Sequence, residues 1–387
     1  MSVKSVAVTG YYGRDNVGDE ILLSSLIDLI TERYGDVEVF VLTSDVKRTE
    51  ELHDVTAVTE SNPIEWVKTS MRVDALIIGG GGLFANSIHL RYPILILINT
   101  VLNNQIWVVG VSVAPIENRY DEALLRFALT SVDSIVVRDE ASKVRLRDIG
   151  ISRRIDVLPD LAFAGDGTSK TAVSREIPKD FIVVSVRPPT GYSRSELNTR
   201  ELARSLDSLK VDLESEIVFL PFKPDVDIKV SRQVTSEMES SAKILEDSDD
   251  FREVEGILSE ANFLVGMRLH SVILSVRNHV PFVGLSYHPK CESVLQQLGT
   301  EEVIWCDSFD ANKLTARVKK RYNSDDVSEA LEAKHRGLAA AAEKNIIQAS
   351  VADEVPSYTD KFIYLAVSLV LIPLSIVRHR WEIYRGG

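Results

Sequence analysis

The sequence predicts an α/β protein with two doubly wound, Rossmann-like domains that face a cleft, followed by C-terminal helices. Short β-branched segments alternate with stretches of helical periodicity, and this alternation occurs twice along the chain of 387 residues. Strands separated by helices form parallel sheets that are covered on both faces. The chain is long enough for two such domains.

The first domain is expected over residues 1–165. Its strand-like segments are rich in Val and Ile, and a helical pattern separates each from the next. They cover residues 3–9, 37–42, 75–78, 106–111, 134–137 and 155–158. Residues 165–179 are polar and show neither helical nor strand periodicity. This predicts an interdomain linker.

The second domain is expected over residues 180–325, and residues 326–387 are expected to form C-terminal helices. The strand-like segments of the second domain are residues 181–186, 216–220, 263–265 and 281–285, and its helical patterns cover residues 194–210, 250–260, 268–278 and 310–320. Residues 328–352 are rich in Ala, Glu and Lys, which predicts one long surface helix. Because ligands bind beyond the carboxyl ends of open parallel sheets, the active site is expected between the domains.

The composition disfavours two classes of protein. The chain has 44 Lys and Arg against 57 Asp and Glu, a net charge of -13, which is opposite in sign to what binding to a nucleic-acid backbone requires. The two cysteines, Cys291 and Cys306, form no motif typical of a disulfide framework or a structural zinc site. The expected location is the cytoplasm.

Residues 362–377 form an uncharged segment of 16 residues, and Arg378 and Arg380 follow it. The segment is slightly short for a bilayer span, and the chain begins with a strand-like run rather than an export signal. A helix in the membrane interface and a last helix packed on the protein are equally compatible with the pattern. In the first case residues 362–385 would contact the cytoplasmic face of the membrane.

A glycine-bounded loop, GYYGRDNVGDE, follows the first strand and leads into a helix. Its spacing departs from the dinucleotide fingerprint G-x-G-x-x-G. Asp19 falls in the first helical turn, where a negative charge stabilises the helix whatever its function. Asn16 beside Asp15 could bind sugar hydroxyls or position a general base.

Four consecutive glycines, residues 79–82, end a strand of the first domain. Glycines allow another group to approach the backbone closely, and that group is either a ligand or a neighbouring helix. The position at a strand end favours a ligand.

Three strand-like segments of the second domain each lead to a cation. These cations are Arg187, Arg268 and Lys290, after residues 181–186, 263–265 and 281–285. Any one of them is more often a surface residue than a ligand-binding one. Three at one sheet edge favour a compact anionic ligand, because Arg binds carboxylate or phosphate through two hydrogen bonds and Lys adds a point charge.

His270 lies two residues after Arg268, near the start of a predicted helix. The pKa of an ordinary imidazole is close enough to neutrality for it to give or take a proton. A lone histidine is more often a core residue than a catalyst, so this candidate depends on the cations beside it.

Together these segments resemble the polysaccharide pyruvyl transferase family. The shared segments are GYYGRDNVGDE at 10–20, IIGGGGLF at 77–84, RDEAS at 138–142, PDLAF at 159–163, SVR at 185–187, RLHS at 268–271 and YHPK at 287–290. Each is short, and their joint order is more specific than any one of them.

The resemblance implies a fold similar to that of GT-B glycosyltransferases and transfer of a pyruvyl group from phosphoenolpyruvate to a sugar. The acceptor would be a cell-surface polysaccharide or its lipid-linked precursor, the product a cyclic ketal, and the leaving group phosphate. By motif match, Arg187, Arg268 and Lys290 would bind the donor, and His270 would be catalytic. No cofactor or metal is implied, since phosphoenolpyruvate is a co-substrate.

The same resemblance places the glycine loops of the first domain at the acceptor. The residues expected there are Asp15, Asn16, Gly18, Asp19, Gly80 and Gly81. Two other functions stay open: a glycosyltransferase that uses a nucleotide sugar, and a non-catalytic protein of the membrane surface. The first needs a base-stacking pocket and an acid that binds ribose, neither of which can be placed in the sequence.

Overall fold

The computed structural model describes most of the chain. The described residues are 3–84, 90–116, 118–165, 175–188, 196–248, 250–287, 304–324 and 326–351, with the single positions 291, 294, 295, 298 and 364. Lys290 lies outside this set.

The chain divides into two compact units, which are described separately. The first unit comprises Met1–Arg14, Leu22–Ala164 and Ala340–Gly387, and the second comprises Asp15–Ile21 and Gly165–Ala339. The end of the first glycine loop and the first turn of the following helix therefore group with the second unit.

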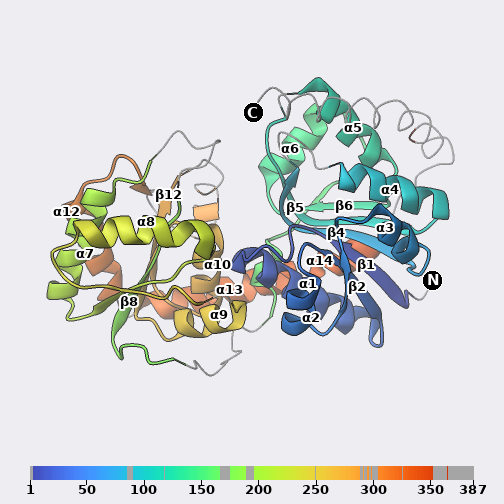
Figure 1. The fold of residues 1–387 in the computed structure, drawn as a ribbon. Coiled ribbons are helices and arrows are strands. Elements are labelled where there is room, and N and C mark those ends of the chain that lie inside the picture. The colour runs from blue at the N-terminus through green and yellow to red at the C-terminus, as the bar shows by residue number, and fades with distance from the viewer. Residues whose placement is uncertain are drawn as a thin grey trace, which may run out of the picture. The chain divides into compact units, whose positions relative to one another are not determined.

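The first unit contains a seven-stranded parallel sheet of order β3-β2-β1-β4-β5-β6-β7 (Figure 1). Its strands are β1 (Ser5–Thr9), β2 (Glu38–Thr43), β3 (Thr56–Thr59), β4 (Ala75–Phe84), β5 (Gln105–Val113), β6 (Ser134–Val137) and β7 (Asp156–Val157). The central strands are apolar and buried along their length, as strands covered on both faces must be.

Helices cover both faces of this sheet. They are α1 (Val17–Tyr34), α2 (Val46–Leu52), α3 (Pro63–Ser70), α4 (Arg91–Leu102), α5 (Arg119–Thr130), α6 (Glu140–Asp148) and α14 (Lys344–Ser350). In Figure 1, α3 to α6 lie on one face, and α1, α2 and α14 lie on the other. This arrangement follows from right-handed crossovers that start near the centre of the sheet and run in both directions.

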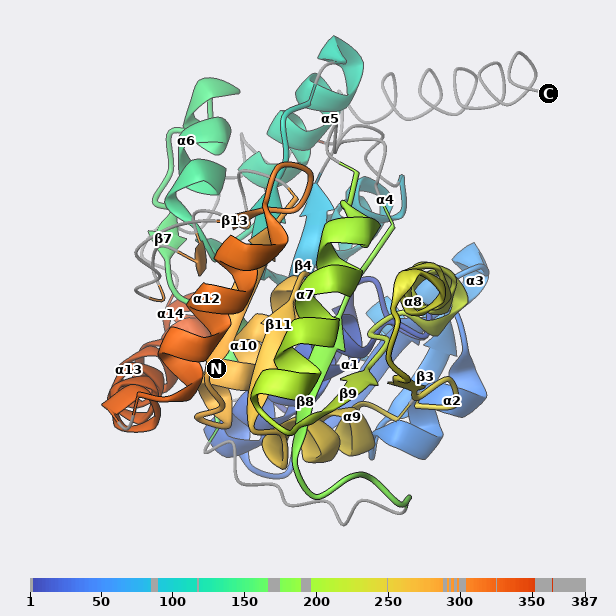
Figure 2. The ribbon, with the colours of Figure 1, turned by 90° about the vertical axis from the view of Figure 1, so that its left-hand side faces the viewer.

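The second unit repeats the architecture with a six-stranded parallel sheet of order β10-β9-β8-β11-β12-β13. Its strands are β8 (Phe181–Ser185), β9 (Glu216–Phe219), β10 (Lys243–Ile244), β11 (Phe263–Gly266), β12 (Phe282–Ser286) and β13 (Ile304–Trp305), and its helices are α7 (Thr199–Asp212), α8 (Pro224–Glu237), α9 (Phe251–Ser259), α10 (Leu269–Arg277), α12 (Ala311–Tyr322) and α13 (Asp326–Ala342). Figure 2 shows α7 and α12 side by side over one face of this sheet.

The predicted fold class is confirmed, and most predicted strands are present within a residue or two. Three short edge strands, β3, β10 and β13, and the helix α8 were not predicted. These three segments carry too little apolar alternation to be distinguished from loops, whereas the short edge strand β7 lies within the strand predicted at residues 155–158. The long surface helix predicted over residues 328–352 is wrong, because α13 ends at Ala342 and α14 begins at Lys344 with Ile346 buried against the first sheet.

One residue of the apolar C-terminal segment is described. Tyr364 is fully buried in the core of the first unit, and its hydroxyl donates a hydrogen bond of 2.5 Å to the carbonyl of Pro93 in α4. The rest of residues 362–377 lies outside the described residues. Within the described part of the chain, none of the helices has the length and apolar character needed to cross a bilayer.

Candidate functional site

Three adjacent strands of the second unit end at the same sheet edge and lead to the predicted donor residues. β8, β11 and β12 are parallel neighbours, so their carboxyl ends lie side by side. Arg187 follows β8, Arg268 follows β11, and Tyr287 follows β12. Lys290, the third predicted cation, lies outside the described residues.

Arg268 is held by a buried carboxylate. Its guanidinium makes a two-point ion pair with Asp227, with Nε donating to Oδ2 over 3.0 Å and Nη2 donating to Oδ1. The Asp227 side chain is fully buried, and that of Arg268 is 12% exposed. Such planar two-point pairs fix the orientation of the guanidinium.

Asp227 also shapes the loop that follows β9. The backbone N–H groups of Phe222 and Lys223 donate to its Oδ2 over 3.1 and 2.9 Å. This residue was not predicted as part of the site, because an Asp in the first turn of a helix such as α8 is ordinary. Its role depends on a partner that is distant in the sequence.

His270 lies in the first turn of α10, directly after Arg268 and Leu269. The backbone of Gly18 packs against its ring: a Cβ atom built on Gly18 would lie 2.1 Å from Nδ1 and 2.7 Å from Cγ. The N–H of Val17 also donates to the carbonyl of Phe222 over 2.9 Å. These contacts explain why residues 15–21 group with the second unit rather than with the first domain, where they were expected.

Within this segment, Asn16 organises the start of α1. Its Nδ2 donates to Oδ2 of Asp19 over 2.5 Å, and its Oδ1 accepts from the N–H of Gly18 over 3.2 Å. Asp15 is exposed and has a positive φ of 51°, a conformation that Asp and Asn tolerate better than most residues. Asn16, Gly18 and Asp19 thus form one small polar turn beside His270.

The packing of Gly18 on His270 gives a sharp prediction. Gly18→Ala should displace the imidazole of His270 and lower the turnover number of the expected pyruvyl transfer at least tenfold. Alanine is a good helix former, so the fold should stay intact. Turnover and thermal unfolding of the variant measure the two effects separately. Gly337→Ala in α13 is the matched control, because its Cβ would meet nothing within 4 Å. Normal turnover in Gly18→Ala would exclude a catalytic dependence on this packing.

Arg187 stacks on Tyr287. Its Cζ lies 4.2 Å from the ring centroid, and Nη1 donates to the phenolic oxygen over 2.5 Å. Burial raises the pKa of Tyr287 to about 12, with a further contribution from Cys291, and the charges of Arg187 and Arg268 partly offset this rise. Both guanidinium groups therefore lie within electrostatic range of one hydroxyl.

This shift predicts a loss of stability at high pH. The pKa of Tyr287 is raised above its unfolded value of 10, so its contribution is complete below pH 10 and is lost as the pH rises toward 12. The free energy of unfolding should fall by about 2 to 3 kcal/mol over this range beyond the fall in Tyr287→Phe. Urea unfolding of both proteins across the range measures the difference, and parallel curves would contradict the assignment.

The glycines of the first unit are explained in part by packing. Leu26 of α1 lies 2.5 Å from a Cβ built on Gly79, and Leu22 lies 3.1 Å from one built on Gly80. Gly80 and Gly81 have φ angles of 72° and 82°, which favour glycine. The close approach predicted for this strand end is therefore made, at Gly79 and Gly80, by a helix.

Two of the other shared segments form a buried ion pair in the first unit. Arg138, after β6, contacts Asp160 over 2.7 Å, and the two side chains are 12% and 6% exposed. Asp139 caps α6 and accepts a hydrogen bond from Ser112 over 2.7 Å. These residues connect the ends of β5, β6 and the segment after β7.

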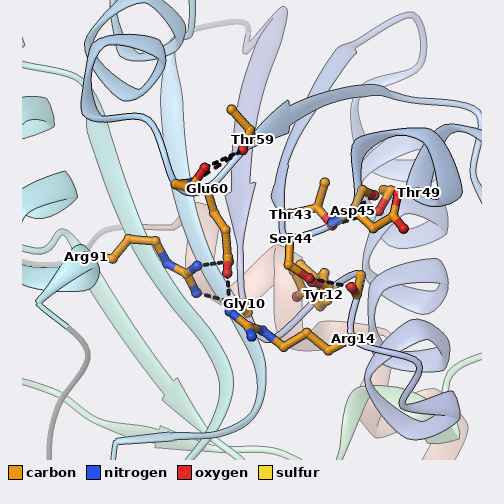
Figure 3. Close-up of polar contacts among 12 residues, drawn as sticks. Gly10, Tyr12, Arg14, Thr43, Ser44, Asp45, Thr49, Thr59, Glu60 and Arg91 are labelled. Carbon is orange, nitrogen blue, oxygen red and sulfur yellow. Dashed lines mark hydrogen bonds and ion pairs between the residues drawn. The ribbon is translucent and has the colours of Figure 1, made fainter.

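A second buried cluster of the first unit was not predicted. Figure 3 shows the carboxylate of Glu60, just after β3, between the guanidinium groups of Arg91 and Arg14. Arg91 also donates to the carbonyl of Gly10 over 2.6 Å, at the end of β1. Arg91 lies at the start of an apolar helix and Glu60 in a loop, and nothing in the sequence indicates that their side chains form an ion pair.

Among the residues that the structure describes, no three His, Cys, Asp or Glu side chains come close enough together to hold a metal ion.

Solved structures with the same fold include a UDP-GlcNAc 2-epimerase and a glycosyltransferase. The UDP-GlcNAc 2-epimerase from Neisseria meningitidis, bound to UDP-GlcNAc, is 11% identical over 89% of this chain and 98% of its own, with a TM-score of 0.58. A glycosyltransferase from Rickettsia africae is 10% identical over 89% of this chain and 97% of its own, with a TM-score of 0.59. At such identities the likeness shows the GT-B-like fold alone.

Comparison with curated protein sequences gives no match. The family model of the polysaccharide pyruvyl transferases matches residues 16–289, which is more than half of the chain and includes Arg187, Arg268 and His270. The chain therefore belongs to the polysaccharide pyruvyl transferase family.

Proposed function

We propose that this protein transfers the pyruvyl group of phosphoenolpyruvate to two hydroxyls of a sugar, forming a ketal and releasing phosphate. The acceptor is a cell-surface polysaccharide or its lipid-linked precursor. The observation that carries the proposal is the position of Arg187, Arg268 and His270 after adjacent strand ends of one unit. Family membership supports the class of reaction.

Phosphoenolpyruvate carries a carboxylate and a phosphate on three carbons, so it suits two guanidinium groups near each other. Arg268 is oriented by Asp227 and Arg187 by Tyr287. A guanidinium fixed in advance loses less conformational entropy when it binds an anion. Lys290 would add a third positive charge, as its place in the shared YHPK segment suggests.

The reaction begins with proton transfer from the imidazolium of His270 to the methylene carbon, C3, of phosphoenolpyruvate. A sugar hydroxyl forms a bond to C2 and gives its proton to a carboxylate. The bond between C2 and the phosphate oxygen then breaks, and its electron pair leaves with phosphate, which Arg187 and Arg268 stabilise. A second hydroxyl attacks C2 and closes the ketal. One released proton returns to His270, and the other leaves with phosphate or solvent.

The polar turn beside His270 is proposed to hold the acceptor hydroxyls. Asn16 and Asp19 lie in the same turn as Gly18, which packs on the imidazole. Asp15 or Asp19 would accept the hydroxyl proton. The backbone at Gly81 would face the sugar, as expected from the sequence, whereas Leu22 of α1 packs on the neighbouring Gly80.

Phosphate release from phosphoenolpyruvate, measured across a panel of sugar acceptors, tests the proposal. Acceptor-dependent release together with a pyruvate ketal on the sugar is the expected result. Turnover of a nucleotide sugar without any response to phosphoenolpyruvate would instead assign the chain to the glycosyltransferase alternative.

A further inference from the structure

The cluster of Glu60, Arg91 and Arg14 contains two positive charges and one negative charge, which is one positive charge more than neutralising Glu60 requires. Glu60 and Arg91 are 8% and 3% exposed, and their ion pair alone balances the two buried charges. Arg91 also ties the carbonyl of Gly10 in place. A second guanidinium, that of Arg14, pairs with the same carboxylate and leaves the cluster with one net positive charge.

Arg14 is the outermost member of this cluster. Its side chain is 31% exposed, whereas Glu60 and Arg91 are buried. One amino group, Nη2, pairs with Glu60, and no described residue accepts a hydrogen bond from its buried Nε. Arg14 is therefore anchored by a buried carboxylate, and the exposed part of its side chain can meet a further acceptor.

An exposed aromatic ring lies next to this guanidinium. Cζ of Arg14 lies 4.7 Å from the ring centroid of Tyr11, which is 40% exposed. Both residues belong to the loop after β1, at the carboxyl edge of the sheet where ligands of doubly wound domains bind. A flat ring beside a fixed cation offers an apolar face and a charged group to one ligand.

We propose that Arg14 and Tyr11 bind an acidic sugar residue of the acceptor, with the guanidinium on its carboxylate or phosphate and the phenol ring against the sugar. This inference rests on the proposed function, since it names the class of acceptor. Arg14 directly precedes Asp15 in the chain, so the pair continues the segment proposed to hold the acceptor hydroxyls. Glu60 is a positioning residue, because it acts through Arg14.

Calorimetric titration of the full chain with three probes tests the assignment without requiring turnover. The probes are glucuronic acid, glucose 1-phosphate and neutral glucose, and the proteins are wild type, Arg14→Gln and Arg14→Lys. Loss of a charge-assisted bond should raise the dissociation constant of the preferred acidic probe at least tenfold in Arg14→Gln. The value for glucose should change less than threefold, and Arg14→Lys should recover part of the affinity.

A matched control is available in the same unit. Arg33 lies over Tyr34, with Cζ 5.9 Å from the ring centroid, in a pair of the same residue types that contains no buried carboxylate. Arg33→Gln should leave all three titrations unchanged. Preference for glucuronic acid or for glucose 1-phosphate identifies the anionic group.

Two outcomes would overturn the inference. One is equal affinity of the wild type for neutral and acidic probes. The other is an equal loss of affinity for both kinds of probe in Arg14→Gln, provided that this variant keeps its unfolding temperature. If Arg14→Gln unfolds, the comparison between wild type and Arg14→Lys decides, because a purely structural cation would show no dependence on probe charge. Absence of pyruvyl transfer would contradict the proposed function separately, as the titrations contain no phosphoenolpyruvate.

Discussion

Replacement of His270 with alanine is expected to lower phosphate release from phosphoenolpyruvate by about 100-fold to 10,000-fold, the usual contribution of a general acid. In the proposed mechanism the imidazole supplies the proton for C3, and without it C2 would not become electrophilic. The two guanidinium groups proposed to bind the donor remain, so the dissociation constant of phosphoenolpyruvate should change less than threefold. Single-turnover phosphate release and donor titration measure the two effects.

The matched control for this variant is His279→Ala. His279 follows α10 at the end opposite to His270, and its ring lies 5.6 Å from that of His335. It should leave phosphate release within a few-fold of wild type. Full activity in His270→Ala would remove this residue from the mechanism.

The second large effect concerns the ion pair between Asp227 and Arg268. Asp227→Asn leaves a guanidinium that is 12% exposed without its counter-charge, which should cost about 3 to 5 kcal/mol in the free energy of unfolding. Arg268→Ala should abolish donor binding, but it also leaves the buried carboxylate of Asp227 without its counter-charge. The double variant Asp227→Asn with Arg268→Leu removes both charges and should regain most of the stability while failing to bind phosphoenolpyruvate.

A similar pair elsewhere in the second unit provides the control. Arg175, before β8, and Glu253, in the first turn of α9, form a two-point pair with distances of 2.8 and 2.7 Å. Glu253→Gln should lower stability modestly and leave the donor dissociation constant unchanged. If the double variant at Asp227 and Arg268 binds phosphoenolpyruvate like the wild type, Arg268 is a structural residue only.

The sequence was most informative where one strand end carries one recognisable residue. Arg187, Arg268 and His270 could be placed because an apolar run predicts a strand and the next polar side chain must follow its carboxyl end. By the same reasoning, the four glycines were expected to follow the end of a strand, but β4 continues through them to Phe84. What approaches them could not be predicted, since Leu22 and Leu26 of α1 reach Gly80 and Gly79 only through tertiary packing.

Partners that meet through folding were not predictable. Nothing near Asp227 in the sequence indicates Arg268, and nothing near Glu60 indicates Arg14 and Arg91. The contact between Gly18 and His270 joins the first and last thirds of the family match. Because this contact cannot be recognised in the sequence, residues 15–19 were expected in the first domain on the basis of chain order alone.

A crystal structure with bound phosphoenolpyruvate tests the central claim most directly. We expect phosphate and carboxylate oxygens within hydrogen-bonding distance of Arg187 and Arg268, with the methylene carbon facing the imidazole of His270. Donor density beside the first sheet, or a bound donor that contacts neither arginine, would contradict it.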